Sequence, residues 1–137
     1  MIVVTSTVNV AMEHSKRKDI EVFVTGGFLR GDWFSLVGAA ANFAMSQIFV
    51  NKAFLGVNGI DAQRGLTSGN PGEAAMNRVI VNQARKKIAV ADRSKLGAIA
   101  THRFAGPEEI DILITDSGAS DELIAPFVDR GIEVRRV

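Results

Sequence analysis

Short runs of apolar and β-branched residues alternate with helix-like stretches along this chain, and this alternation restricts the fold more than any other feature. Strands separated by helices are typical of parallel sheets, because two parallel neighbours need a long crossover connection. We therefore predict an α/β fold in one domain spanning residues 1–137, with a mostly parallel open sheet flanked by helices. The expected strands cover residues 2–5, 20–25, 52–57, 88–91, 110–115 and 132–137, and the expected helices cover 6–15, 39–47, 71–87 and 121–129.

Two further segments do not follow the alternation. Residues 33–37 are expected to pair with the strand at 20–25 across a turn at Arg30-Gly31-Asp32. Residues 58–72 are rich in glycine, contain a proline and show no periodicity, which predicts a long loop. Long loops in compact domains are uncommon and tend to be functional, so this segment is a favoured place for a ligand site.

The charge and the residue composition exclude several classes of function. A net charge of +1 at pH 7 gives no electrostatic reason to expect nucleic acid or an anionic membrane as a partner of this chain. The absence of cysteine rules out disulfides, thiolate metal sites and cysteine nucleophiles. His14 and His102 lie far apart in the sequence and lack ligand-like spacing, so we expect no metal and no cofactor.

The sequence also predicts where the protein works. No apolar run approaches the roughly 20 residues that span a bilayer. Residues 1–5 lack the basic region, long apolar stretch and cleavage site of a signal peptide. We therefore expect a soluble, cytoplasmic protein without membrane contact.

Polar residues follow two of the expected strands, at the edge where the ligands of parallel sheets collect. After the strand at 52–57, Asn58 can donate and accept hydrogen bonds to sugar hydroxyls, and Gly59 allows close backbone approach. Further along, residues 67–70 offer donors just before a helix N-terminus, where anions are favoured. Turn chemistry alone explains the same residues equally well.

Three charged positions lie near these strand ends. Lys95 can pair with a phosphate or carboxylate, although spacing alone favours a surface lysine that is exposed or paired with Asp92. Glu73 can act as a general base, although the helix dipole is the simpler explanation for an acid in a first turn. Asp116, followed by Ser-Gly, is expected to be a plain turn residue before a helix cap.

Seven segments carry a more specific pattern: VVTST (3–7), GGFLRG (26–31), SLVG (35–38), KAFLGVNGID with GLT (52–67), EAAMNR (73–78), ADRSKLG (91–97) and IDILITD (110–116). Taken in order and with their spacing, these segments resemble the effector-binding domain of the DeoR family of bacterial transcription regulators. The resemblance covers nearly the whole chain.

The resemblance implies a fold similar to ribose-5-phosphate isomerase, glucosamine-6-phosphate deaminase and coenzyme A transferases. It also implies an effector site for a phosphorylated sugar or a related intermediate, whose binding releases the regulator from DNA. Glu73 corresponds to an acid of the related isomerases, and Lys95 becomes the favoured charged contact. By position in the family motifs, the site consists of Asn58, Gly59, Asp61, Glu73, Asp92 and Lys95.

Family members carry an N-terminal helix-turn-helix domain, and DNA contact is expected only through that domain, which this chain is expected to lack. The resemblance also implies that the chain starts after the first strand of the family's sensor domain and its Asp-Ser-Gly-Thr-Thr-like loop. Loss of a central strand would expose apolar edges that pair with other chains, so we expect a homo-oligomer.

Two other functions stay open at this point. The alternative is a sugar-phosphate isomerase or deaminase. The deaminases pair an aspartate with a histidine in the corresponding loop, where this chain has Asn58 and Ile60. An amide cannot accept a proton as a general base, and isoleucine has no acid–base chemistry, so we expect no catalytic residues. The third function is a partner-binding remnant without useful ligand affinity.

Overall fold

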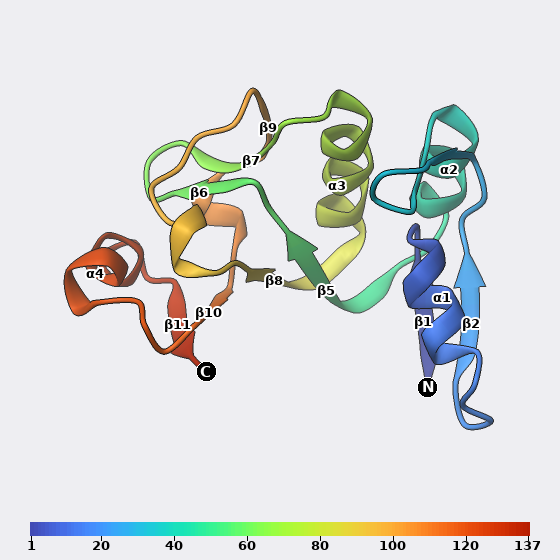
Figure 1. Ribbon diagram of the computed structural model, residues 1–137, viewed down its shortest axis with the longest axis horizontal. Coiled ribbons are helices and arrows are strands. Elements are labelled where there is room, and N and C mark those ends of the chain that lie inside the picture. Colours follow the sequence, from blue (N-terminus) through green and yellow to red (C-terminus); the bar gives the residue numbers. More distant parts are fainter. The chain divides into compact units, whose positions relative to one another are not determined.

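The computed structural model describes residues 1–137, which form two compact units, residues 1–48 and residues 49–137. Each unit has its own sheets and helices, which Figure 1 shows in order along the chain. No helix of either unit is both long enough and apolar enough to span a membrane.

A four-stranded sheet forms the centre of residues 49–137. Its strands lie in the order β11, β10, β8, β5, and every neighbouring pair is parallel. This arrangement confirms the α/β fold and the parallel sheet that the alternation of segments predicts. The strands are β5 (Val50–Gly56), β8 (Ala84–Val90), β10 (Ile112–Thr115) and β11 (Glu133–Arg136).

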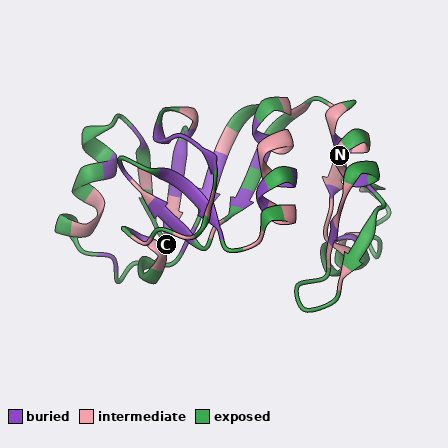
Figure 2. Ribbon diagram, turned by 90° about the horizontal axis from the view of Figure 1, so that it is seen from above, coloured by how far each residue is buried: buried purple, intermediate pink, exposed green.

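The connections between these strands place both helices of the unit on one face of the sheet. The chain moves in the same direction across the sheet at each step, from β5 to β8, β10 and β11. Because such crossovers are right-handed, successive steps in one direction lie on the same face. Leu55, Ala89 and Leu113 of this face form one core cluster with buried residues of both helices, and Figure 2 shows buried residues gathered in the strands. The helices are α3 (Pro71–Gln83) and α4 (Asp121–Asp129).

A second, antiparallel sheet occupies the segment that was expected to be a long loop. The loop prediction for residues 58–72 is wrong, because two short strands form there and the second pairs with a strand over residues 102–105. All four residues of β7 are buried, so this strand has no alternating pattern that periodicity could detect. The strands, in sheet order, are β6 (Gly59–Asp61), β7 (Gly65–Ser68) and β9 (His102–Ala105).

The helix that was expected to reach residue 87 ends at Gln83, and β8 begins at the next residue. Ala84 already has extended angles, with φ −96° and ψ 136°. From Ala84 to Val90 the backbone pairs in parallel with β5. These sheet hydrogen bonds override the helical propensity of residues 85–87, because propensity is a weak preference that tertiary pairing outweighs.

Residues 1–48 form a smaller unit that contains two two-stranded sheets. The strands β1 and β2 pair in parallel. The strand β4 pairs with β3 rather than with β2, so the predicted pairing of residues 33–37 is wrong. Gly26 and Gly27 have φ of 71° and 113°, and this left-handed backbone redirects the chain after β2. The elements are β1 (Ile2–Thr5), α1 (Val8–His14), β2 (Glu21–Val24), β3 (Phe28–Arg30), β4 (Ser35–Val37) and α2 (Ala39–Ser46).

Candidate functional site

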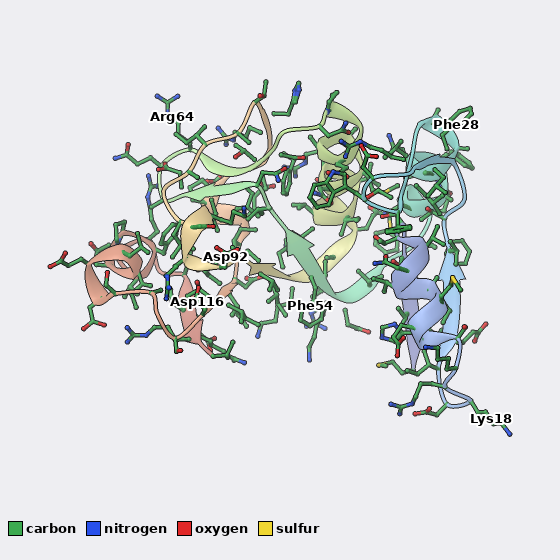
Figure 3. The ribbon with its side chains drawn as sticks, viewed as in Figure 1. Lys18, Phe28, Phe54, Arg64, Asp92 and Asp116 are labelled. Carbon is green, nitrogen blue, oxygen red and sulfur yellow. The ribbon has the colours of Figure 1, made fainter.

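Three neighbouring parallel strands, β5, β8 and β10, end at the same level of the sheet register. The last paired residue of each strand is followed, two positions later, by a polar residue. These polar residues are Asn58, Asp92 and Asp116, so all three lie at one edge of the sheet. Figure 3 shows Asp92 and Asp116 near each other at the ends of β8 and β10. This carboxyl edge is where open parallel sheets bind their ligands.

Asn58 connects the end of β5 to the start of α3. Its Oδ1 accepts a hydrogen bond from the Gly69 N–H at 2.9 Å and another from the Ser68 hydroxyl at 3.3 Å. The Ser68 oxygen accepts from the Asn70 N–H at 3.2 Å, and Asn70 Oδ1 caps α3 by accepting from the Glu73 N–H at 3.0 Å. Asn58 is exposed, and because its oxygen is engaged, its amide nitrogen is the group that can donate to a ligand.

Gly59 lies where backbone segments approach one another closely. The Thr67 hydroxyl donates to the Gly59 carbonyl at 3.2 Å. A Cβ at Gly59 would lie 2.2 Å from the Ala98 carbonyl oxygen. The Gly97 N–H donates to the Ile60 carbonyl at 2.8 Å, so the segment after Lys95 lies against β6. The buried Gly59 therefore allows this close packing beside the carboxyl edge.

The turn after β8 carries Asp92 and Lys95 on a short 3-10 helix, η1 (Arg93–Lys95). Asp92 Oδ1 accepts a hydrogen bond from the Ser94 N–H at 2.8 Å and a second from the Ser94 hydroxyl. These two bonds, aided by the charge of Lys95, hold the pKa of Asp92 below its ordinary value. Lys95 is half-buried and forms no ion pair. The structure therefore does not pair Lys95 with Asp92.

Asp116 has a role that its sequence pattern did not indicate. Its Oδ1 accepts from the Arg93 N–H at 2.6 Å, and its Oδ2 accepts from the Arg93 guanidinium at 3.1 Å and from the Gly118 N–H at 3.2 Å. The backbone bond from Arg93 is the main cause of a pKa of Asp116 below its ordinary value. These contacts fix the end of β10 to the turn that carries Lys95. The expectation of a plain turn at Asp116 is therefore incomplete, because contacts between distant segments leave no local signal.

Glu73 and Asp61 lie at different places around the β6–β7 hairpin. Glu73 is in the first turn of α3, where the helix dipole favours its charge. Asp61 lies at the hairpin turn, and its Oδ1 accepts from the N–H groups of Gln63 and Arg64 at 2.9 and 2.7 Å. The carboxylate of Asp61, like that of Asp92, is thus bound within its own turn.

The carboxyl edge carries the Asn58 amide and the Lys95 ammonium beside two carboxylates that accept hydrogen bonds from Ser94 and Arg93. The Asn58 amide and the Lys95 ammonium suit an anionic, hydroxylated ligand. The buried hydroxyl of Thr115, at the end of β10, has no hydrogen-bond partner in the protein. The pKa values of Asp92 and Asp116 are lowered, so both stay ionised and neither can donate a proton near neutral pH. No three His, Asp or Glu side chains gather as a metal site.

An α/β domain with an open parallel sheet and polar side chains at its carboxyl edge is the class that this fold and site define. The sequence model of one such family, described as the DeoR C-terminal sensor domain, matches residues 1–117. The chain belongs to this family, which confirms the resemblance.

Its relatives include three transcription regulators. The HTH-type transcriptional regulator GlpR of Haloferax volcanii is 42% identical over 113 residues, which cover 82% of this chain and 44% of the relative. The HTH-type transcriptional repressor GlcR of Bacillus subtilis is 34% identical over 133 residues, 96% of this chain and 51% of the relative. The putative aga operon transcriptional repressor of Escherichia coli O157:H7 is 31% identical over 134 residues, 98% of this chain and 50% of the relative. The chain thus spans about half the length of these relatives.

Proposed function

We propose that residues 1–137 are the effector-sensing domain of a DeoR-type repressor of sugar metabolism, and that they bind a phosphorylated sugar or a related intermediate without turnover. The observation that carries the proposal is Lys95, a half-buried cation without an ion pair on a turn that Asp92 and Asp116 fix in place. A phosphate gains more from such an ammonium than a neutral sugar does, because hydrogen bonds between charged partners are about twice as strong as neutral ones.

The site residues have different roles in binding the ligand. Lys95 contacts the phosphate, and the Asn58 amide donates to a sugar hydroxyl beside the N-terminus of α3, where Glu73 lies. Asp92 shapes the Lys95 turn through Ser94, and Gly59 lets that turn approach β6. Asp61 contributes by closing the hairpin turn.

The relatives support the regulatory part of the proposal. All three are named as transcriptional regulators or repressors, and each is about twice as long as its matched region. On this proposal, DNA is contacted by a helix-turn-helix domain outside residues 1–137, and the protein works in the cytoplasm without membrane contact.

Self-association is part of the proposal. Large apolar side chains of the β3–β4 hairpin are exposed, among them Phe28 at 81% and Trp33 at 62%. Exposed apolar patches mark interaction surfaces in soluble proteins. Light scattering behind size exclusion tests this part at micromolar concentration. A monomer at every concentration would contradict the homo-oligomer and leave the effector site unaffected.

A thermal-shift titration tests the effector site. Phosphorylated sugars are compared with their unphosphorylated parents at equal concentration. Ligand at 100 times its Kd stabilises the native state by about 2.7 kcal/mol, which gives a readily measured rise in Tm. We expect a rise with a phosphorylated compound only, loss of that rise in Lys95→Ala, and its retention in the matched control Lys18→Ala, whose lysine is exposed and lies in the other unit.

Two outcomes would overturn the sensor assignment. Product formation from the stabilising compound, followed by nuclear magnetic resonance, would favour the isomerase alternative. The absence of a shift with every phosphorylated sugar would favour a partner-binding module without an effector.

A further inference from the structure

A further polar side chain lies beside the carboxyl edge, on the strand β9, which Figure 1 shows next to β7. It is His102, the first residue of β9, and its register partner in β7 is Ser68. Directly opposed residues of antiparallel strands have their Cβ atoms about 5 Å apart. The Ser68 hydroxyl donates to Asn58 Oδ1 at 3.3 Å. Asn58, Ser68 and His102 therefore form one row beside the carboxyl edge.

The imidazole of His102 has no partner in the protein. His102 is half-buried, and neither of its ring nitrogens takes part in a hydrogen bond or an ion pair. Ser68 differs in this respect, because its hydroxyl bonds both Asn58 and the Asn70 N–H. Removing a polar group from water without giving it a partner costs free energy. A ligand that bonds the imidazole recovers this cost.

The backbone that leads to His102 also connects it with Lys95. Near the start of this segment the Gly97 N–H donates to a carbonyl of β6 at 2.8 Å. Near its end the Ala100 N–H donates to the Thr67 hydroxyl of β7 at 2.8 Å. Beyond this point β9 pairs with β7 and packs against α3. Lys95 and His102 thus lie at the two ends of one segment that is fixed to β6 and β7.

On the basis of the function proposed above, we propose that His102 is a further ligand-binding residue of the effector site. Its imidazole bonds a hydroxyl of the sugar beside Asn58, while Lys95 binds the phosphate. A neutral imidazole offers one donor and one acceptor, and a hydroxyl group can both accept and donate. A site that hydrogen-bonds a hydroxyl rejects analogues that lack it, because the polar group of the protein is then left unpaired. His102 therefore selects among phosphorylated sugars, whereas Lys95 binds any of them.

Inorganic phosphate separates the two contacts, because it has no sugar part. Isothermal titration calorimetry measures its Kd and the Kd of the phosphorylated sugar that gives the largest rise in Tm. We expect His102→Ala to weaken binding of the phosphorylated sugar about tenfold and to leave the Kd of inorganic phosphate unchanged. Lys95→Ala should weaken binding of both compounds.

His14 provides the matched control, since it is the other of the two histidines and lies in residues 1–48. His14→Ala should change neither Kd. His102→Gln keeps a donor and an acceptor, so it should recover part of the affinity that His102→Ala loses. Nuclear magnetic resonance of the parent protein follows both imidazoles without any substitution. The phosphorylated sugar should shift the Hε1 resonance of His102 and leave that of His14 in place.

Three results would overturn the role of His102 and leave the effector site standing. These are an unchanged Kd of the phosphorylated sugar in His102→Ala, equal weakening of both compounds, and an unmoved His102 resonance when the phosphorylated sugar is bound. If no phosphorylated sugar binds the parent protein, the proposed function itself fails, and the role of His102 fails with it.

Discussion

The two units of this chain differ in how much apolar surface they enclose. Residues 49–137 contain one continuous core, in which Leu66, Ala89 and Leu113 have no exposed surface. In residues 1–48 the buried apolar side chains are few, and large ones such as Phe28 and Phe43 are 81% and 69% exposed. Both units come from similar alternating sequence, so alternation alone does not determine which segments become stable.

Sheet size explains the difference. The strands of residues 49–137 pair into sheets of four and three, and their crossovers close over one face. Residues 1–48 have only pairs of strands, and a two-stranded sheet is marginally stable in water. We therefore expect the free energy of unfolding to be concentrated in residues 49–137. Hydrogen exchange followed by mass spectrometry measures the two units separately, and it is the common readout for the variants below.

The largest effect is expected for Gly65→Ala in the β6–β7 hairpin. Gly65 has φ 88°, and a Cβ there would lie 2.0 Å from the Ala105 carbonyl oxygen, so the backbone must move. We expect residues 49–137 to lose more than about 4 kcal/mol. The control is Gly31→Ala, where a Cβ meets nothing within 4 Å, and it should stay within about 0.5 kcal/mol. Comparable losses in both variants would contradict the contrast between the units.

A smaller effect is expected for Leu113→Ala in the core cluster. Leu113 is fully buried, so its truncation leaves a cavity and should lower the stability of residues 49–137 by about 3 kcal/mol. Leu36→Ala makes the same change in the smaller unit, where the site can collapse more easily because fewer buried neighbours surround it. Urea unfolding with exchange detection should show the smaller change for Leu36→Ala. Equal changes would mean that residues 1–48 are packed as tightly as residues 49–137.

An intermediate, pH-dependent effect is expected at Glu109. Its two oxygens accept hydrogen bonds from the Arg78 guanidinium at 2.6 and 2.8 Å, and the Gly106 N–H adds another at 2.8 Å. The contact with Arg78 is the main cause that lowers the pKa of Glu109 from 4.5 to about 2. A lowered folded-state pKa stabilises the protein above pH 4.5, and this stabilisation is lost as the pH falls to about 2.

Glu109→Gln removes this dependence. We expect the variant to be about 2 kcal/mol less stable than the parent at pH 7, with the difference vanishing near pH 2. Urea unfolding of residues 49–137 at pH 7, 4.5 and 2 measures this difference in the free energy of unfolding. A difference that stays constant across this range would show that the Glu109 charge is not what stabilises the contact.

The smallest effect is expected for Arg17→Ala in residues 1–48. Arg17 and Asp19 form an ion pair at 2.8 Å, but their side chains are 64% and 66% exposed. Exposed ion pairs contribute little, because water and salt screen them. We expect no measurable change in either unit by hydrogen exchange. A clear loss of protection in β1 and β2 would show that this unit depends on surface charge instead of packing.

The apolar runs predicted the main strands and helices, because those runs are distinct from the segments between them and Glu73 is typical of the first turn of a helix. The small sheet was missed since its strands are short, and β7 is buried on both faces. Whether Lys95 forms an ion pair with Asp92 could not be predicted either. Spacing places Asp92 beside it, but only the folded turn shows that Asp92 binds Ser94 and that Asp116 holds Arg93. Such choices between nearby and distant partners depend on the tertiary structure.

The direct junction between α3 and β8 has a mechanical consequence. The helix begins at the carboxyl edge, spans about 20 Å and passes into β8 with no intervening residue. No loop residue separates the two elements, so the position of the helix and the position of the first residues of β8 are fixed together. A change of length or of backbone angles at this junction would therefore shift the register of β8 against β5, and an inserted residue there should be far less tolerated than one in a surface loop.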